Sequence, residues 1–250
     1  MQQLYNVNGL IFWGEKEINA RKIVESHLVQ AVKDRLKAEN RAWEFFQMEA
    51  PLLTPFDKIN KGYSASDVFV TNHSVFPAEY PLDEALEAGV PVVRPGDQVE
   101  LVLRPETTMG SYAYARYLLN PHNEQKVRMP LVVWQHGKSF RREQDQPSKL
   151  MRLKEFYQLE FQCIYSLSTK NEYAGALIPA VAGALSQLVG GVRIVPSDRL
   201  PDYSEETTDI EHIESGMELC SCSKRKDFEN AKVIEIAVGT DRVVKHFLGV

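Results

Sequence analysis

The sequence predicts an α+β fold in which a mainly antiparallel β-sheet is flanked by helices. Residues 15–40 carry apolar side chains at near-helical spacing with charges between them, which predicts one long helix. Residues 131–142 and 152–165 are separated by a polar segment with a central proline, and the second is rich in aromatics without a helical stripe, which indicates an antiparallel hairpin. Further strand-like segments follow, and this order of elements favours a sheet of mainly antiparallel strands.

The first half of the chain contains one segment that interrupts the regular elements. After the long helix, a short apolar strand is expected over 43–48. Residues 56–98 are rich in glycine, proline and asparagine, so we expect a loop-rich insertion there. It would surround one strand at 68–70 and a short helix at 82–88, within a single domain spanning 1–250.

The second half of the chain alternates short apolar runs with longer apolar-rich segments, which indicate strands and helices respectively. The expected elements are a strand at 100–103, a helix at 107–119, one strand or two over 131–142, a strand at 152–165, a helix at 170–189, a strand at 191–195, a polar loop at 197–210, strands near 216–221 and 232–237, and a terminal helix from 243 to 248.

Composition places the chain among ordinary globular proteins, since it has 250 residues of which 44% are hydrophobic and 25% charged. A net charge of −5 excludes nucleic-acid binding through overall charge, so any RNA contact would need a local basic patch. Cys163, Cys220 and Cys222 give no disulfide framework and indicate a reduced, cytoplasmic protein. We expect no signal peptide and no membrane partner, because no apolar run approaches the roughly 20 residues that span a bilayer.

Charged and aromatic residues recur along the expected hairpin: Arg141, Glu143, Arg152, Phe156 and Glu160. Residues two or four apart leave the same face of a strand, so a hairpin would gather these side chains over one patch of sheet. Arginine offers a planar fork of donors for phosphate oxygens, and an aromatic ring can stack on a purine. The patch is therefore either a nucleotide site or a solvated strand face with weak ion pairs.

A pattern that resembles motif 2 of the class II aminoacyl-tRNA synthetases runs through this hairpin: Phe140-Arg141-x-Glu143, a loop, then Arg152-x-x-x-Phe156-x-x-x-Glu160. The resemblance implies ATP as a bound substrate. It implies that Arg141 bridges the amino-acid carboxylate and the α-phosphate, and that Glu143 contacts the adenine side. It further implies that Arg152 reaches the far phosphates and that Phe156 stacks on adenine.

Two other segments resemble the remaining motifs of the same family. The run from Val238 to Arg242 follows an apolar strand and resembles motif 3, which implies that Arg242 holds the γ-phosphate and that Gly239 lets the backbone approach the nucleotide. Helix 15–40, followed by a strand that ends at Pro51, resembles motif 1 and implies a homodimer. An ordinary helix–strand pair would have the same pattern.

Three segments resemble the glycyl branch of the family: Leu103-Arg104-Pro105-Glu106-Thr107-x-x-Gly110, Gln135-x-Gly137-x-Ser139, and Ile234-Glu235 through Asp241-Arg242. The resemblance implies that Glu106 and Glu235 hold the α-ammonium group of the amino acid through charge-assisted hydrogen bonds. It places Gln135 and Arg141 in the same amino-acid site.

Other features depart from the glycyl pattern. Ala237 stands where that pattern has serine, and residues 218–223 look more like a segment of the seryl enzyme. Glu218 is the candidate carboxylate for holding Mg²⁺ on ATP in either branch. Glycine is therefore the expected amino acid, with serine or another small residue second.

The remaining cysteines and histidines give no metal pattern. Cys220 and Cys222, with His212 eight residues upstream, make a poor zinc site. The other histidines are expected to be surface or core residues: His27, His73, His122, His136 and His246.

The resemblance as a whole implies a ligase that activates a small amino acid with ATP and Mg²⁺ and transfers it to tRNA. Arg141, Arg242 and Glu218 would act by positioning and by neutralising charge. The sequence given ends eight residues after Arg242, where a glycyl enzyme continues into an anticodon-binding domain, so the acceptor stays open. One alternative is transfer to a carrier protein, a metabolite or a modified nucleic acid. Another is a non-catalytic accessory subunit.

Overall fold

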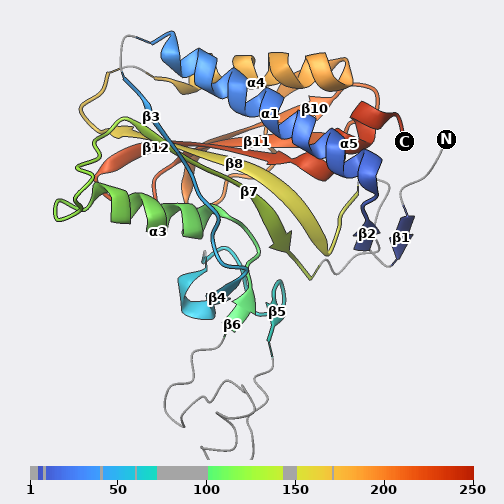
Figure 1. The fold of residues 1–250 in the computed structure, drawn as a ribbon, viewed down its shortest axis with the longest axis horizontal. Coiled ribbons are helices and arrows are strands. Elements are labelled where there is room, and N and C mark those ends of the chain that lie inside the picture. The colour runs from blue at the N-terminus through green and yellow to red at the C-terminus, as the bar shows by residue number, and fades with distance from the viewer. Residues whose placement is uncertain are drawn as a thin grey trace, which may run out of the picture.

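The computed structural model describes residues 5–7, 10–39, 42–59, 61–71, 101–142, 151–170 and 172–250. Its centre is a seven-stranded sheet in the order β3-β7-β8-β12-β11-β10-β9, in which β3 is parallel to β7 and the other neighbours are antiparallel (Figure 1). The strands are β3 (Glu44–Gln47), β7 (Leu131–Phe140), β8 (Glu155–Ser166), β9 (Val192–Pro196), β10 (Ser204–His212), β11 (Glu218–Arg225) and β12 (Ala231–Gly239). The predicted fold class is confirmed.

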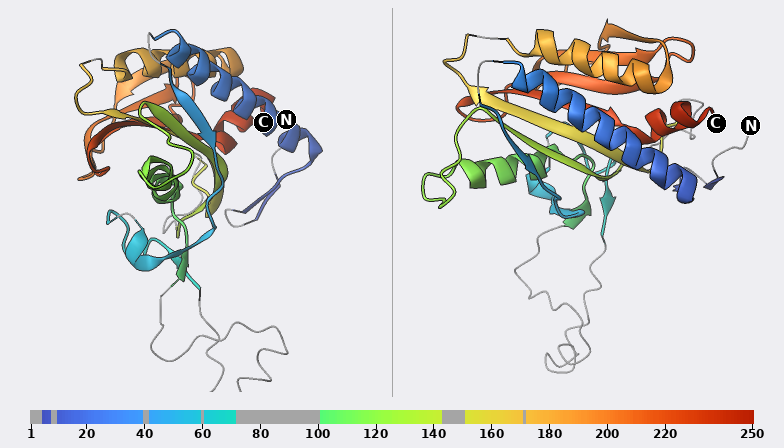
Figure 2. Two further views of the ribbon diagram at one scale, coloured as in Figure 1. Left: turned by 60° about the vertical axis from the view of Figure 1, so that its left-hand side comes forward. Right: turned by 45° about the horizontal axis from the view of Figure 1, so that its top comes forward.

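Helices cover both faces of this sheet, but unequally (Figure 2). α1 (Glu15–Lys37), α4 (Ala174–Val189) and α5 (Thr240–Leu248) pack against one another on one face. α3 (Thr108–Leu119) lies on the opposite face, over β7 and β8. Within the described residues, no helix is both long and apolar enough to cross a membrane.

Alternation along the strands separates an apolar face from a polar one. On β7 and β8, the side chains of Val132, Trp134, Leu159 and Phe161 are buried in the large core beneath α1, α4 and α5. The residues between them face the other way, because successive side chains of a strand point to opposite faces. A smaller apolar core beneath α3 covers one end of that second face, and the rest of it is polar.

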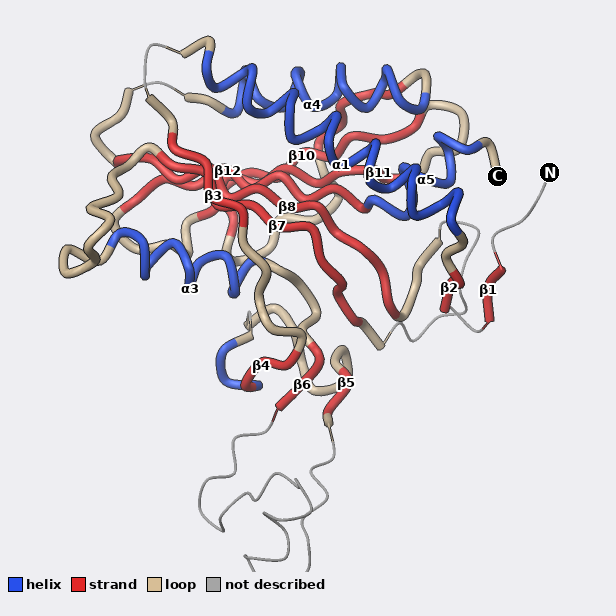
Figure 3. Tube along the Cα trace, viewed as in Figure 1, coloured by secondary structure: helices blue, strands red, loops and turns tan. Residues whose placement is uncertain are grey.

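Two smaller sheets flank the main one (Figure 3). The first has the order β4-β6-β5 and consists of β4 (Leu53–Pro55), β5 (Phe69–Val70) and β6 (Leu101–Leu103), with a short 3₁₀ helix, η1 (Phe56–Lys58), after β4. The second is the hairpin of β1 (Tyr5–Val7) and β2 (Leu10–Phe12). The helix expected at 82–88 lies outside the described residues.

The prediction of a polar loop over 197–210 is wrong, because residues 204–212 form β10, which pairs with both β9 and β11. The segment lacks the apolar alternation typical of a strand. Its side chains include Thr207 and Asp209, which lie toward the polar face of the sheet, while Ile210 points into the large core. The sequence also predicts no strand at β4 and no hairpin at β1–β2, and both are present.

Candidate active site

The polar face of the main sheet is a row of side chains brought together by strand pairing. Gln135 of β7 lies opposite Glu160 of β8, which lies opposite Ala237 of β12, and Ala237 lies opposite Ser221 of β11. One step along, Gln162 lies opposite Glu235. These positions lie on four different strands, and only the register of the sheet makes them neighbours.

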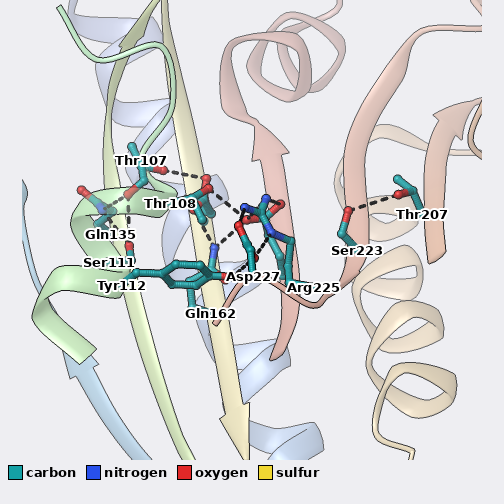
Figure 4. A network of polar contacts seen from close by, with 12 residues as sticks. Thr107, Thr108, Ser111, Tyr112, Gln135, Gln162, Thr207, Ser223, Arg225 and Asp227 are labelled. Atoms are coloured by element: carbon teal, nitrogen blue, oxygen red, sulfur yellow. Dashed lines mark hydrogen bonds and ion pairs between the residues drawn. The ribbon is translucent and has the colours of Figure 1, made fainter. Parts of the chain in front are cut away.

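Gln135 anchors the start of α3 to this face. Its amide Nε2 donates to the carbonyl of Thr107 at 2.9 Å and to Ser111 Oγ at 2.8 Å, and its Oε1 accepts from the backbone N–H of Ala50 at 3.2 Å (Figure 4). Gln135 is fully buried, and its amide donors and acceptor are used within the protein. The geometry therefore gives Gln135 a positioning role beneath Thr107.

Two buried carboxylates, Glu160 and Glu235, share a hydrogen-bond network with residues at the start of α3. Thr107 Oγ1 donates to Glu160 at 2.7 Å, and Thr108 Oγ1 donates to Glu235 at 2.9 Å. Gln162 Nε2 donates to both carboxylates, at 2.7 and 2.8 Å. Burial, reinforced by the nearby charge of Glu235, raises the pKa of Glu160 to about 7. This pair therefore forms an acidic floor beneath α3.

Arg225 supplies a buried positive charge beside that floor. Its Nη1 lies 3.2 Å from Glu235 Oε2, and its Nη2 lies 2.6 Å from Asp227 Oδ2. Its guanidinium also lies 3.9 Å from the ring centroid of Tyr203, and the side chain is fully buried. Burial alone would lower the pKa of Arg225, but the neighbouring carboxylates of Glu235 and Asp227 have the larger effect and raise it. We expect such a fully paired charge to fix the shape of the site.

Glu106 contributes a third carboxylate to this part of the site. It is only 8% exposed, and its Oε1 has no hydrogen-bond partner among the described residues. Burial raises the pKa of Glu106 to about 8, and the neighbouring charges of Glu235 and Glu160 also oppose its ionisation. A buried acceptor without a donor is costly, so this oxygen is a natural place for a cationic donor from a ligand.

Arg141 and Phe156 meet at the rim of the acidic floor, as the hairpin predicts. Arg141 Nε donates to the carbonyl of Pro105 at 3.1 Å, and its Cζ lies 5.1 Å from the Phe156 ring centroid. The Tyr63 ring lies 5.5 Å from the same guanidinium. Burial raises the pKa of Tyr63, and the charges of Arg141 and Glu106 act on its hydroxyl. Tyr63 therefore belongs to the site, although nothing in its sequence context indicates this.

Two other residues of the hairpin pattern have a different outcome. Glu143 lies outside the described residues, so its role stays a prediction. Arg152 was expected to share a strand face with Phe156 and Glu160, which is wrong because β8 begins at Glu155 and Arg152 precedes it. Its proposed contact with the far phosphates therefore depends on the approach to β8 and not on strand alternation.

Arg242 and Glu218 lie together at the end of the sheet where β12 stops and β11 starts. Arg242 Nη1 donates to the carbonyl of Glu218 at 2.8 Å and lies 3.7 Å from Glu218 Oε2. Gly239 at the end of β12 pairs with Gln158, two residues from Phe156, so this cluster is on the same side of the site as Phe156. The Glu218 side chain is half exposed and can reach a ligand.

Glu218 fits a role in holding Mg²⁺ jointly with a nucleotide. In the part of the chain that the structure describes, no group of three or more histidine, cysteine, aspartate or glutamate side chains could hold a metal on its own. Mg²⁺ commonly binds through one or two carboxylates plus the phosphate oxygens of its substrate. A single accessible carboxylate beside Arg242 suits that arrangement.

Gly137 allows Arg104 to cross β7 and hold the neighbouring segments. Arg104 donates to the carbonyl of Ala50 at 2.6 Å and to the carbonyl of Lys138 at 2.8 Å. A Cβ atom at Gly137 would lie 2.3 Å from Arg104 Nη2. The glycine of the Gln135-x-Gly137 segment is therefore required by packing.

We expect Gly137→Ala to lower the free energy of unfolding by about 1–3 kcal/mol, the usual cost of overpacking. Urea denaturation measures this change. Gly183→Ala on α4 is the matched control, because no atom lies within 4 Å of its added Cβ. The control should be neutral or stabilising by about 0.5–1 kcal/mol, since alanine favours a helix. An equal response of the two variants would contradict the proposed clash.

Comparison with known proteins was made for both sequence and structure. No family model matches the chain. The glycine–tRNA ligase of Mycoplasmopsis synoviae is 30% identical over 117 residues, which is 45% of this chain and 25% of the relative. Those of Mycoplasma capricolum and Staphylococcus aureus are 28% and 29% identical over 141 and 143 residues, or 53% and 54% of this chain. The chain thus matches only 25–30% of the length of these relatives.

The solved structures extend the similarity to nearly the whole chain. A crystal structure of prolyl-tRNA synthetase from Cryptosporidium parvum, complexed with halofuginone and AMPPNP, superposes with a TM-score of 0.70 at 14% identity. The superposition covers 98% of this chain and 48% of that chain. The chain is therefore similar in sequence to part of the glycine–tRNA ligases, and it has the fold of a class II aminoacyl-tRNA synthetase catalytic domain.

Proposed function

We propose that the chain is a ligase that activates a small amino acid with ATP, glycine first, and passes the aminoacyl group to the acceptor end of tRNA. One observation carries the proposal: Oε1 of Glu106 is buried and has no hydrogen-bond partner among the described residues. Glu160, Glu235 and the guanidinium of Arg141 lie close enough to Glu106 for their charges to act on it. An ammonium group fits this acidic floor, and a carboxylate fits Arg141. The two ends of a free amino acid therefore have complementary charges in one site.

Arg141 and Arg242 would carry the chemistry of adenylation by position and charge. The amino-acid carboxylate is already ionised at neutral pH, so no general base is needed for its attack on the α-phosphorus. Arg141 would hold the carboxylate against the α-phosphate while Phe156 stacks on the adenine. Arg242 would hold the γ-phosphate as pyrophosphate leaves. Glu218 would hold Mg²⁺ together with the nucleotide, and the bound ion would supply positive charge that offsets the charge developing in the reaction.

A small amino acid is favoured by what surrounds the acidic floor. Arg225 and Tyr203 fill the space beside Glu235, and Tyr63 covers the rim. Ala237 removes the hydroxyl of the glycyl pattern, but it pairs with Ser221, which supplies a hydroxyl at the next position across the sheet. Glycine therefore ranks first and serine second.

ATP–pyrophosphate exchange with each amino acid, followed by transfer to total tRNA, tests the proposal. Exchange with transfer supports a tRNA ligase. Exchange without transfer supports the alternative acceptors, namely a carrier protein, a metabolite or a modified nucleic acid. The absence of exchange with every amino acid would favour an accessory subunit. The homodimer, the cytoplasmic location, and a single domain with an insertion at 56–98 stay predictions.

We expect the affinity for glycine to increase with pH. In the empty site Glu106, with a pKa of about 8, is largely protonated at pH 6.5, and an ammonium group must displace that proton. The KM for glycine in exchange should therefore fall by on the order of tenfold between pH 6.5 and pH 8.5 and level off above the pKa.

The KM for ATP, measured over the same pH range, serves as the internal control and should change little. Glu106→Gln should weaken glycine binding and reduce its pH dependence, since the amide does not titrate and only the smaller contribution of Glu160, with a pKa of about 7, remains. A wild-type KM for glycine that is constant across this range would contradict the assignment of Glu106.

A further inference from the structure

His136 connects three elements on the apolar side of β7. Its side chain leaves the strand opposite to Gln135, toward α1 and α5, and is 7% exposed. Its Nδ1 lies 2.7 Å from Glu25 Oε2 on α1, and its Nε2 lies 3.0 Å from Thr240 Oγ1 at the start of α5. The sequence predicts only a surface or core residue at this position, and the structure shows two polar partners for its ring.

The direction of each hydrogen bond follows from the partners. Thr240 Oγ1 donates to the backbone carbonyl of Tyr157 at 3.0 Å, and a carbonyl can only accept. A hydroxyl has a single hydrogen, so Thr240 must accept from His136 Nε2. At the other nitrogen, the hydrogen bond with His136 lowers the pKa of Glu25, and an ionised carboxylate can only accept as well.

We propose that His136 is held as an imidazolium that donates from Nδ1 to Glu25 and from Nε2 to Thr240, and that it thereby positions the start of α5. The hydrogen bonds link β7 to α1 on one side and, through Thr240 of α5, to the backbone carbonyl of Tyr157 on β8 on the other. Each hydrogen bond then has one donor and one acceptor. A neutral ring would leave one of these contacts without a hydrogen.

The surrounding charges are compatible with a cation at this position. From α1, Glu25 faces the ring directly, and Arg21 stacks on Tyr157 at 3.6 Å from its ring centroid. From β8, the Tyr157 ring meets the His136 ring edge-on at 5.6 Å between centroids. From α5, Asp241 is buried close to Arg21, and burial raises its pKa to about 7. The His136 ring therefore contacts one carboxylate whose pKa is lowered, that of Glu25, and packs against the ring of Tyr157.

The start of α5 sets the position of Arg242, because Arg242 is the third residue of this helix. Thr240 is the first residue of α5 and is fully buried, and Asp241 Oδ2 accepts from the backbone N–H of Tyr157 at 3.0 Å. Thr240 and Asp241 thus fasten the helix to the residue that follows Phe156. His136 is then a positioning residue, and its influence on ATP binding rests on the proposed function, whereas its protonation does not.

Nitrogen-15 NMR of the histidine rings tests the proposal directly. At pH 7 the wild-type chain, with the signal assigned by its loss in His136→Gln, should show both His136 nitrogens at imidazolium shifts. One nitrogen at the pyridine-type shift in the wild-type chain would overturn the proposal. This readout uses the intact protein and needs no activity.

Conservative variants separate the role from simple packing. Glu25→Gln and Thr240→Val should each convert a large share of His136 to the neutral ring, whereas Thr240→Ser should keep the wild-type spectrum because the hydroxyl remains. Glu15→Gln is the matched control, since Glu15 is an exposed carboxylate of the same helix. An unchanged His136 spectrum in Glu25→Gln would also count against the proposal.

Exchange kinetics give the functional consequence. We expect Glu25→Gln to raise the KM for ATP by about threefold to tenfold, the effect of losing one charge-assisted hydrogen bond, while the KM for glycine stays close to wild type. If the wild-type chain shows no exchange, the proposed function fails, and the NMR result still decides the state of His136. If the ring is an imidazolium in the wild-type chain but Glu25→Gln leaves the KM for ATP unchanged, the positioning role of His136 is contradicted.

Discussion

Replacing Arg141 with alanine is expected to lower the rate of ATP–pyrophosphate exchange by on the order of 10²–10³, comparable to the loss of one strong oxyanion donor. The guanidinium lies near Glu106 and the Phe156 ring, so in the proposed arrangement it contacts both the amino-acid carboxylate and the α-phosphate. The reaction brings two anions together, and the barrier rises when that charge is not neutralised. Exchange measured at saturating ATP and glycine isolates the effect on the chemical step.

Two companion variants make the Arg141 result specific. Arg142→Ala removes the neighbouring, exposed arginine and should leave exchange within about twofold of wild type, since exposed charges contribute little. Arg141→Lys keeps the charge but loses the planar fork, so it should fall between wild type and alanine. Exchange near the wild-type rate in Arg141→Ala, or an equal loss in Arg142→Ala, would contradict the assignment.

The sequence predicts β7, β8 and the approach of Arg141 to Phe156 well, because these features arise from residues close together in the chain. Apolar strands on either side of a polar, proline-containing segment indicate β7 and β8, and the pairing of these strands brings Arg141 and Phe156 together. Glu106 and Glu235 were named as amino-acid contacts from the resemblance, and both lie in the acidic cluster with Glu160. Their roles in binding stay predictions.

The parts that could not be predicted depend on contacts between distant segments. Arg225 reaches Glu235 only through the pairing of β11 with β12, and Tyr63 reaches Arg141 from the segment between β4 and β5. β10 is missed for a related reason: apart from Ile210, which points into the large core, its side chains are polar, so the segment has no apolar stripe. A strand that lines a functional site carries polar side chains there, so it lacks the apolar alternation by which strands are recognised in a sequence.

Arg225→Met is expected to lower the free energy of unfolding by about 3–5 kcal/mol, because removing one partner of a buried ion pair leaves the other charge uncompensated. Arg225 is fully buried between Glu235 and Asp227. Urea denaturation at pH 7 measures the loss. Arg193→Met is the matched control, since it removes a similar ion pair with Glu211 on the exposed edge strand β9. That pair should contribute only about 0–1 kcal/mol.

The pH dependence of the Arg225→Met defect distinguishes an uncompensated charge from a simple packing fault. Without the guanidinium, the carboxylates that surround it lose their counter-charge. The charge of Arg225 is the largest influence that opposes the raised pKa of the buried Glu106, so the pKa of Glu106 should rise further in the folded variant. A carboxylate with a raised pKa in the folded state destabilises that state as pH rises through the unfolded pKa. The difference in unfolding free energy between the variant and the wild type should therefore be larger at pH 8 than at pH 5. A defect that is equal at the two pH values would mean that Arg225 acts through packing, and that the acidic floor does not depend on its charge.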